Sequence, residues 1–429
     1  MQSFPARFRT LRVLSALFAI LLWSVPLLAA DMPSAKPEDV GLSTERLARI
    51  DRAIEASISQ QRIAGAVAII ARHGKVAYHK AFGMADIDAR RPMRTDDLFR
   101  LYSMTKPVVS VALLTLYEEN KFQLTDPLEK FIPGFRNTKV FVRMDENGKM
   151  VLEEPRRKPT IQDAFRHTPG LVSGLGRGPI NERYRELGLV MERIRSVRQE
   201  VETLATIPLE YHPGERWNYG LAHDVQAYLV EYFSGMPLDR YLKERVFDPL
   251  GMKDTGYGVP RNLAPRFANN YEPSAGGALQ VRESATTGMY TRFDKVPLGT
   301  VGLSSTAMDY IRFAQMLLNG GELNGVRVLG KKTVELLRQN HLPEPVKATA
   351  SEYAPNASGY GLGFAVTLSA AAEGNLGSPG AFGWSGAATT KFYIDPAEDM
   401  VAVFFSQRWP YDALLLNEFQ TLLYQSIVR

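Results

Sequence analysis

The alternation of hydrophobic and polar positions predicts regular elements near both ends of the chain. Apolar residues recur at helical spacing from Thr44 to Ser59, after an N-cap candidate at Ser43. Strands are expected over residues 64–71 and 75–82, joined by a short turn. Towards the other end, the pattern predicts helices over 306–318, 332–339 and 411–427 and strands over 360–368, 388–394 and 400–405.

One segment is apolar on nearly every side. Residues 108–116 carry apolar side chains almost without a break, which is typical of a helix buried at the centre of a domain. Pro107 lacks the N–H that an interior helical turn requires, so it is tolerated only near a helix start. The helix is therefore expected to begin close to Ser103.

The middle of the chain follows a different pattern. From about residue 125 to 294 it is rich in proline and predicts helices and loops, with a small hairpin over 140–144 and 149–153 that turns at Asn147-Gly148. We therefore predict an α+β fold, with a sheet built from both ends of the chain and flanked by helices. Residues 31–108 and 295–429 would form this lobe, and residues 109–294 an inserted, mostly helical lobe.

The first thirty residues are typical of a cleaved signal peptide. Three arginines precede an apolar run from Val13 to about Leu28, which ends in Ala29-Ala30. The alternative is an uncleaved anchor, but the apolar core is short for a membrane span and is interrupted by Pro26. We expect a periplasmic or secreted protein without a membrane span after cleavage.

Charge and composition narrow the function classes. The 429 residues carry a formal net charge of +5, of which three positive charges lie in the predicted signal peptide, leaving 5 − 3 = +2. So small a charge argues against a nucleic-acid partner. Cysteine is absent, which excludes disulfides and thiolate metal sites. Neither H-E-x-x-H nor G-x-S-x-G occurs, so no metal site, no cofactor and no α/β-hydrolase nucleophile are indicated.

Ser103 and Lys106 form the single S-x-x-K motif of the chain, at the start of the buried helix. A spacing of three places both side chains on one helical face. A serine hydroxyl becomes a nucleophile when a neighbouring base takes its proton. At a helix start, the N–H of Ser103 also points to where an oxyanion would form.

Two further segments offer chemistry. Tyr219 lies in Pro-Gly-Glu-Arg-Trp-Asn-Tyr-Gly-Leu; a phenol has a pKa of about 10, but a neighbouring lysine ammonium can make it a base. Residues 383–387 read Gly-Trp-Ser-Gly-Ala, a glycine-rich lead into the strand expected at 388–394. Such a segment lets a backbone N–H approach a substrate oxygen, and Ala387 is the candidate donor.

These segments, in this order, resemble the serine β-lactamase and penicillin-binding superfamily, in the branch shared by class C β-lactamases and family VIII carboxylesterases. The resemblance runs from about residue 40 to the C-terminus and includes Leu-Tyr-Ser-Met-Thr-Lys ending at Lys106, His-Thr-Pro-Gly-Leu starting at His167, and residues 302–310. It implies an antiparallel sheet of the β-lactamase/transpeptidase type, catalysis by Ser103, Lys106 and Tyr219, and structural support of the site by His167.

Two departures from the β-lactamase pattern favour an esterase. Leu221 stands two residues after the tyrosine, where β-lactamases of this branch have asparagine. Trp384-Ser385-Gly386 replaces their Lys-Thr-Gly. The missing lysine removes a charge-assisted contact of roughly 1.5 to 3 kcal/mol with a β-lactam. Family VIII esterases share both departures, so these four residues are expected to border an ester substrate with an apolar group.

The resulting hypothesis is cleavage of small carboxylic esters of short to medium acyl chain through an acyl-enzyme on Ser103. Tyr219, aided by Lys106, would take the serine proton, and the N–H groups of Ser103 and Ala387 would hold the oxyanion. The site is expected between the lobes. Alternatives are a β-lactamase or D-amino-acid peptidase, an acyltransferase with the same acyl-enzyme, and a catalytically silent binding protein. The natural substrate, any β-lactam turnover and the oligomeric state stay open.

Overall fold

The computed structural model describes residues 32–189, 196–291, 296–344, 346 and 358–429. The predicted signal peptide, residues 1–30, lies outside this part of the chain. None of the helices in the described ranges is long and apolar enough to cross a membrane.

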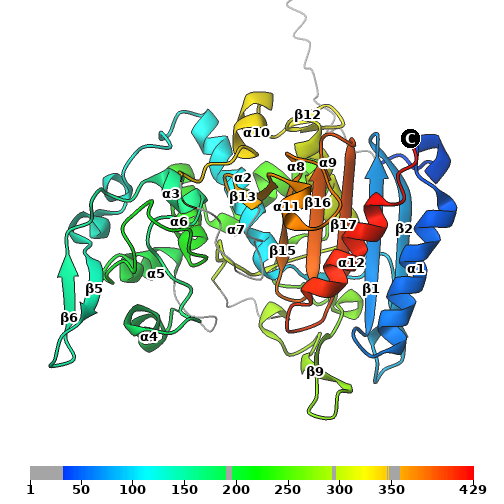
Figure 1. Cartoon of the computed structure of the whole chain (residues 1–429), viewed down its shortest axis with the longest axis horizontal. Helices are drawn as coiled ribbons and strands as arrows, with labels where there is room; N and C mark the ends of the chain where they lie inside the picture. The colour runs from blue at the N-terminus through cyan, green and yellow to red at the C-terminus, as the bar shows by residue number, and fades with distance from the viewer. Residues whose placement is uncertain (1–31, 190–195, 292–295, 345, 347–357) are drawn as a thin grey trace, which may run out of the picture.

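The fold is α+β and is organised around an eight-stranded antiparallel sheet (Figure 1). Its strand order is β13-β14-β15-β16-β17-β1-β2-β3. At its centre an early strand pairs with a late one, with Ala66 opposite Ser406. The strands are β1 (Gly65–Arg72), β2 (Lys75–Asp86), β3 (Arg91–Pro92), β13 (Ser358–Tyr360), β14 (Ala365–Thr367), β15 (Phe382–Gly386), β16 (Thr390–Asp395) and β17 (Met400–Ser406).

Both faces of this sheet are covered, which explains why every residue of β1 is buried. Side chains alternate between the faces of a strand. Accordingly, Val67 and Ile69 pack in the core around α2 (Thr105–Glu118) and α9 (Ala307–Leu318), whereas Ala68 and Ile70 pack under α1 (Thr44–Ser59) and α12 (Ala413–Tyr424). The sheet is thus the middle of three layers, with the two terminal helices side by side on its outer face (Figure 1).

The helices follow the apolar periodicity closely. The Ser43 hydroxyl accepts a hydrogen bond from the Arg46 N–H, which confirms the predicted N-cap of α1. Thr306 caps α9 in the same way. From Thr105 to Leu116 every residue of α2 is buried, as its apolar sequence predicts.

The segment between α2 and α9 is mostly helix and loop. Its predicted hairpin is confirmed by β5 (Val140–Met144) and β6 (Met150–Glu153), which project from the molecule (Figure 1). The helices here are α3 (Ile161–Phe165), α4 (Pro179–Glu186), α5 (Val197–Leu204), α6 (Ala222–Ser234), α7 (Leu238–Leu242) and α8 (Asp248–Leu250). Short strands β4 (Phe99–Arg100), β7 (Gly256–Tyr257) and β10 (Leu303–Ser305) form a second sheet, and β8 (Asn270–Pro273) pairs with β9 (Leu279–Glu283).

Two strand predictions need correction. The single strand expected over 360–368 is a hairpin of β13 and β14. The chain turns between them because the Leu362 N–H donates to the Leu337 carbonyl of α10 (Lys331–Leu337) and the Gly361 N–H donates to the Phe364 carbonyl. Residues 382–386, expected as a lead into a strand, are themselves β15. This segment pairs along its length with β16, with Trp384 opposite Phe392.

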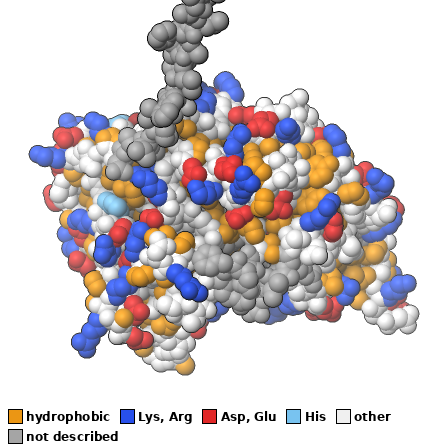
Figure 2. All heavy atoms as spheres, turned by 180° about the vertical axis from the view of Figure 1, so that it is seen from behind, with side chains coloured by type: hydrophobic (Ala, Val, Ile, Leu, Met, Phe, Trp, Pro, Cys, Tyr) orange, Lys and Arg blue, Asp and Glu red, His pale blue; other side chains and the backbone are white. Residues whose placement is uncertain are grey.

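Surface charge is mixed on the face opposite to that of Figure 1. Figure 2 shows Lys and Arg interspersed with Asp and Glu there, with apolar side chains between them. This face carries no field of a single sign of the kind that attracts polyanions.

Candidate active site

Ser103 follows a strained stretch of backbone. It lies in η2 (Tyr102–Met104), one turn of 3-10 helix that runs into α2. The preceding Tyr102 has a φ of 45°, in the left-handed region, which costs about 1 to 3 kcal/mol for such a residue. Its phenol accepts a hydrogen bond from Asn270 Nδ2 at 3.1 Å and its ring packs against Tyr290. The surrounding contacts therefore fix the backbone that presents the serine.

Three predicted catalytic side chains meet at the Ser103 hydroxyl. Tyr219 Oη lies 2.6 Å from Ser103 Oγ, and Lys106 Nζ lies 3.2 Å from the same atom. The lysine nitrogen is also 4.5 Å from the centre of the Tyr219 ring. Both distances to Ser103 are within hydrogen-bonding reach of a proton acceptor.

Lys106 is a buried amine with few partners. Its ammonium donates to Ser103 Oγ and to the Thr300 carbonyl oxygen at 2.9 Å, and no carboxylate of the described residues lies within ion-pair distance. Burial lowers the pKa of Lys106 to about 7, although the charge of Asp224 acts in the opposite direction. The amine can therefore change its protonation near neutral pH.

The loop that carries Tyr219 is clamped against residues 167–172. The N–H of Asn218 donates to the His167 carbonyl, and the N–H of Leu221 to the Val172 carbonyl. Between them, a Cβ on Gly220 would lie 2.6 Å from the Val172 carbonyl, so only glycine allows the two backbones to approach this closely.

His167 packs against this loop and contacts both Gly220 and Tyr219. It is fully buried, its Nδ1 accepts the Gly220 N–H at 3.4 Å, and its ring lies 4.8 Å from that of Tyr219. Burial, reinforced by the charge of Lys106, holds the pKa of His167 well below its usual value. The imidazole is therefore neutral, consistent with the structural role expected for it.

The strand β15 closes the other side of the site. A Cβ on Gly386 would lie 2.3 Å from the Leu101 carbonyl oxygen, so glycine lets this strand end press directly on the backbone two residues before Ser103. Ala387 follows at the turn, 9% exposed. Its N–H donates no hydrogen bond within the described chain, which leaves it free for a ligand oxygen.

The four residues expected near a substrate are placed differently from one another. The Trp384 ring lies 5.7 Å from the Tyr219 ring and edge-on to Tyr360, so it forms an apolar wall beside the site. Leu221 is a core residue at the start of α6, 6% exposed. Strand alternation directs the Ser385 side chain to the opposite face of the sheet from Trp384, towards α12. The contact of Ser385 with substrate stays a prediction.

Sequence reasoning assigned no role to Asp224, yet this residue acts on the site. Asp224 Oδ1 accepts the Thr300 N–H at 2.9 Å, and the carbonyl of Thr300 in turn accepts from Lys106. The carboxylate thus positions Thr300, the residue whose carbonyl accepts the hydrogen bond from the lysine. The sequence did offer one sign of this role, because Asp224 is a carboxylate among largely apolar residues of α6. The part played by Thr300 leaves no sign in the sequence, because it acts through its backbone carbonyl.

The arrangement has the parts that serine-based acyl transfer requires. The described residues contain no group of three or more His, Asp or Glu side chains that could hold a metal ion. A nucleophile, a proton acceptor pair and a free backbone donor are the parts that acyl transfer requires.

Comparisons with known proteins show which family the chain belongs to. The Beta-lactamase family model matches residues 50–425. Protein Rv1367c of Mycobacterium tuberculosis is 34% identical over 355 residues, covering 81% of this chain and 86% of its own length. Esterase EstB of Burkholderia gladioli is 30% identical over 368 residues, covering 82% and 87%.

A solved structure agrees with the fold. EstCE1, "a hydrolase with promiscuous acyltransferase activity", superposes with a TM-score of 0.76 at 24% identity, covering 89% of this chain and 99% of EstCE1. The chain belongs to the β-lactamase family and is a serine hydrolase of the β-lactamase fold, with esterase relatives.

Proposed function

We propose that this protein is a carboxylesterase that cleaves small esters through an acyl-enzyme on Ser103. The observation that carries the proposal is the convergence of Tyr219 Oη and Lys106 Nζ on Ser103 Oγ, at 2.6 and 3.2 Å. The 30% identity to esterase EstB supports the substrate class.

In the first half-reaction, Ser103 Oγ attacks the ester carbonyl carbon and its proton passes to the Tyr219–Lys106 pair. Two arrangements of the pair can accept it, a phenolate beside an ammonium or a phenol beside a neutral amine. They hold the same number of protons, so they are one reactive state of a coupled pair. The tetrahedral intermediate then breaks its bond to the alkoxide, which leaves as the alcohol with the proton from the pair.

The N–H groups of Ser103 and Ala387 hold the oxyanion in this mechanism. The contact of Gly386 with the Leu101 backbone supports this assignment, because it brings the end of β15 beside η2. In the second half-reaction, water gives a proton to the same pair and attacks the acyl carbon. The carbon–Oγ bond breaks, the acid is released and Ser103 regains its proton.

Trp384 is the residue that separates an ester from a β-lactam in this proposal. Its indole stands where the β-lactamases resembled by this chain carry a lysine, so no cation at this position receives the carboxylate of a β-lactam. The apolar wall that it forms with Tyr219 suits the acyl or alcohol group of a neutral ester.

Acyl transfer to an alcohol is a second candidate, favoured by one specific observation. The structurally similar EstCE1 is described as having promiscuous acyltransferase activity. An acyl-enzyme on Ser103 would react with an alcohol as it does with water. Addition of a primary alcohol during turnover, followed by product analysis, distinguishes the two outcomes.

Export belongs to the proposal as well. The arginine-rich start, the apolar run and Ala29-Ala30 support cleavage of residues 1–30 and a periplasmic or secreted location. N-terminal sequencing of the protein expressed from its full chain is expected to start at Asp31; an intact Met1 would contradict cleavage.

The proposed substrate class is tested with purified protein lacking residues 1–30. Hydrolysis of p-nitrophenyl butyrate and octanoate is compared with hydrolysis of the chromogenic cephalosporin nitrocefin. We expect fast ester cleavage with slow or absent nitrocefin turnover. Efficient nitrocefin turnover with poor ester cleavage would replace the esterase by a β-lactamase.

A further inference from the structure

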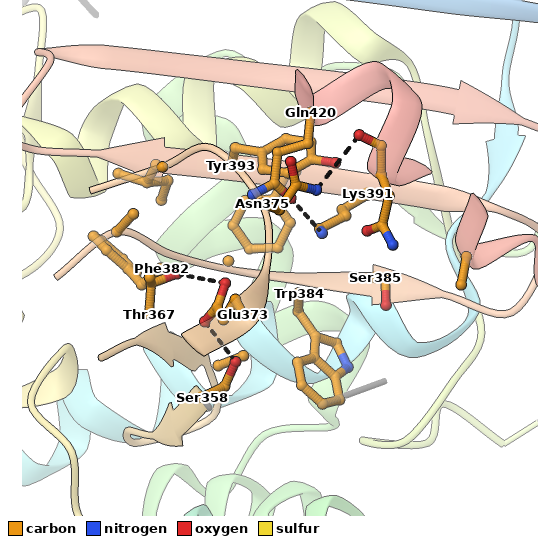
Figure 3. Close-up of a pocket in the computed structure, with 18 of the residues that line it drawn as sticks. Ser358, Thr367, Glu373, Asn375, Phe382, Trp384, Ser385, Lys391, Tyr393 and Gln420 are labelled. Atoms are coloured by element: carbon orange, nitrogen blue, oxygen red, sulfur yellow. Dashed lines mark hydrogen bonds between the residues drawn. The ribbon is translucent and has the colours of Figure 1, made fainter. Parts of the chain in front are cut away.

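A cavity lies on the other side of the sheet from the contact between Trp384 and Tyr219. It has a volume of about 340 Å³ and is lined by β14, β15 and β16, by the end of α11 (Ala370–Glu373) with the loop after it, and by α12. Figure 3 shows Lys391 and Ser385 on its strands, with Glu373 and Gln420 on the elements that cover them. None of the residues assigned above to proton transfer or oxyanion binding borders it through its side chain.

The lining of the cavity includes a cation. Lys391 Nζ donates a single hydrogen bond, to Gln420 Oε1 at 3.2 Å, and lies 4.6 Å from the centre of the Tyr393 ring. It forms no ion pair with a carboxylate of the described residues. An ammonium has three donors, so two remain for a ligand. Desolvation lowers the pKa of Lys391 to about 8, against the opposing charge of Glu373, so the group is still mostly protonated at neutral pH.

Ser385 adds a hydroxyl beside this ammonium. It is the direct cross-strand neighbour of Lys391 in the β15–β16 ladder, and such neighbours have Cβ atoms about 4.5 to 5.5 Å apart. The Ser385 side chain is 3% exposed, and its hydroxyl makes no hydrogen bond to another described residue. Lys391 and Ser385 together therefore present free donors suited to a carboxylate.

The lining also includes an anion. The two carboxylate oxygens of Glu373 accept hydrogen bonds from Ser358 Oγ at 2.8 Å and from Thr367 Oγ1 at 3.4 Å. These hydroxyls orient the carboxylate while leaving it lone pairs for further donors. Glu373 has no ion-pair partner among the described residues, and it interacts with Lys391 only through the field across the cavity.

We propose that this cavity binds a small zwitterion of the α-amino-acid class, with its carboxylate on Lys391 and Ser385 and its ammonium on Glu373. Two opposite charges that face one cavity without pairing leave each partly desolvated, and a ligand carrying both complementary charges compensates both of them at once. The volume is at the lower end of the range for small-molecule sites, which fits one amino acid and not an extended peptide.

The test is isothermal titration calorimetry of the purified protein with D- and L-alanine and D- and L-leucine. We expect saturable binding of at least one of them. N-acetylalanine lacks the ammonium and alaninamide lacks the carboxylate, so each is expected to bind at least tenfold more weakly than alanine or leucine does. Equal binding of the N-acetyl form, or no binding of any of the four amino acids at millimolar concentration, would overturn the proposal.

Variants locate the site. Lys391→Met and Glu373→Gln are each expected to weaken binding at least tenfold, whereas Lys243→Met, which removes an exposed lysine paired with Asp248, serves as the matched control and binds as wild type does. Thermal melts of each variant establish that it is folded. Ser103→Ala is expected to bind normally, and loss of binding in that variant would assign the ligand to the Ser103 site and overturn the second site.

Discussion

Two buried ionic sites of this molecule use opposite arrangements. Asp163, near the loop that supports Tyr219, accepts hydrogen bonds from Arg157 at 2.8 Å, Arg166 at 2.9 Å and Thr168 at 2.7 Å. Burial alone would raise the pKa of Asp163, but the two guanidinium groups outweigh it and lower the pKa to about 2. Lys106 is equally buried and has only Ser103 and a carbonyl as partners.

The fold stabilises the charge of Asp163 and destabilises that of Lys106. Asp163 stays charged at any physiological pH and holds a structural junction together. The charge of Lys106 is destabilised by its surroundings, so the amine can exchange a proton with Ser103 and Tyr219.

The largest effect is expected from Lys106→Met. Loss of the proton acceptor pair should lower kcat for ester hydrolysis by about a thousandfold. The same change removes a buried amine that the fold disfavours, so the free energy of unfolding at pH 7 should rise by about 1 kcal/mol. Steady-state kinetics and urea unfolding check both results, and a variant that is inactive and also strongly destabilised would contradict the contrast.

Asp163→Asn should behave in the opposite way. The Arg157 and Arg166 side chains, 41% and 11% exposed, lose the charge of their shared partner, so the free energy of unfolding should fall by about 2 kcal/mol. Because the pKa of Asp163 is lowered, its contribution is fully present above its usual value of 3.8 and is lost as pH falls towards 2. Urea unfolding at pH 7 and pH 3 is expected to show a smaller difference between wild type and variant at pH 3; a constant difference would rule out the ionic explanation.

The pH profile of kcat/KM reports on the reactive pair directly. The active state carries one proton fewer than the phenol–ammonium state, and the pKa of Lys106 is about 7. The rate should therefore rise about tenfold per pH unit below 7 and level off above it, with a midpoint that belongs to the pair. A profile that is flat from pH 5 to 8 would show that no such group titrates.

Asp224→Asn should give the smallest effect. The amide oxygen can still accept the Thr300 N–H, but the negative charge that raises the pKa of Lys106 is gone. The rising limb of the pH profile should move to lower pH by up to about one unit. Asp239→Asn, on α7, is the matched control, and we expect the rising limb of its pH profile to stay where it is in the wild type. A shift of the Asp224→Asn profile to higher pH would contradict the electrostatic role.

Much of the scaffold could be predicted from the sequence because it depends on local patterns. The N-caps at Ser43 and Thr306, the buried helix after Ser103 and the hairpin at 140–153 each have a signal within a few residues. The division of residues 358–367 into β13 and β14 depends on a hydrogen bond to the distant Leu337 carbonyl, and no local pattern predicts it.

In the candidate site, too, some residues could be predicted from the sequence and others could not. Ser103, Lys106 and Tyr219 were predicted because their flanking residues resemble a known family. The Thr300 carbonyl was not, because any residue type supplies one, and the action of Asp224 depends on that carbonyl. The cavity around Lys391 is assembled from segments between residues 358 and 424, and its unpaired charges are visible only once these are folded together.

The central claim is that Ser103 carries the acyl group, and the most direct measurement is mass spectrometry of protein quenched in acid during turnover of p-nitrophenyl butyrate. We predict a mass increase of one butyryl group, located on the peptide that contains Ser103 and absent from Ser103→Ala. Turnover by Ser103→Ala, or a butyryl group on any other residue, would contradict the account.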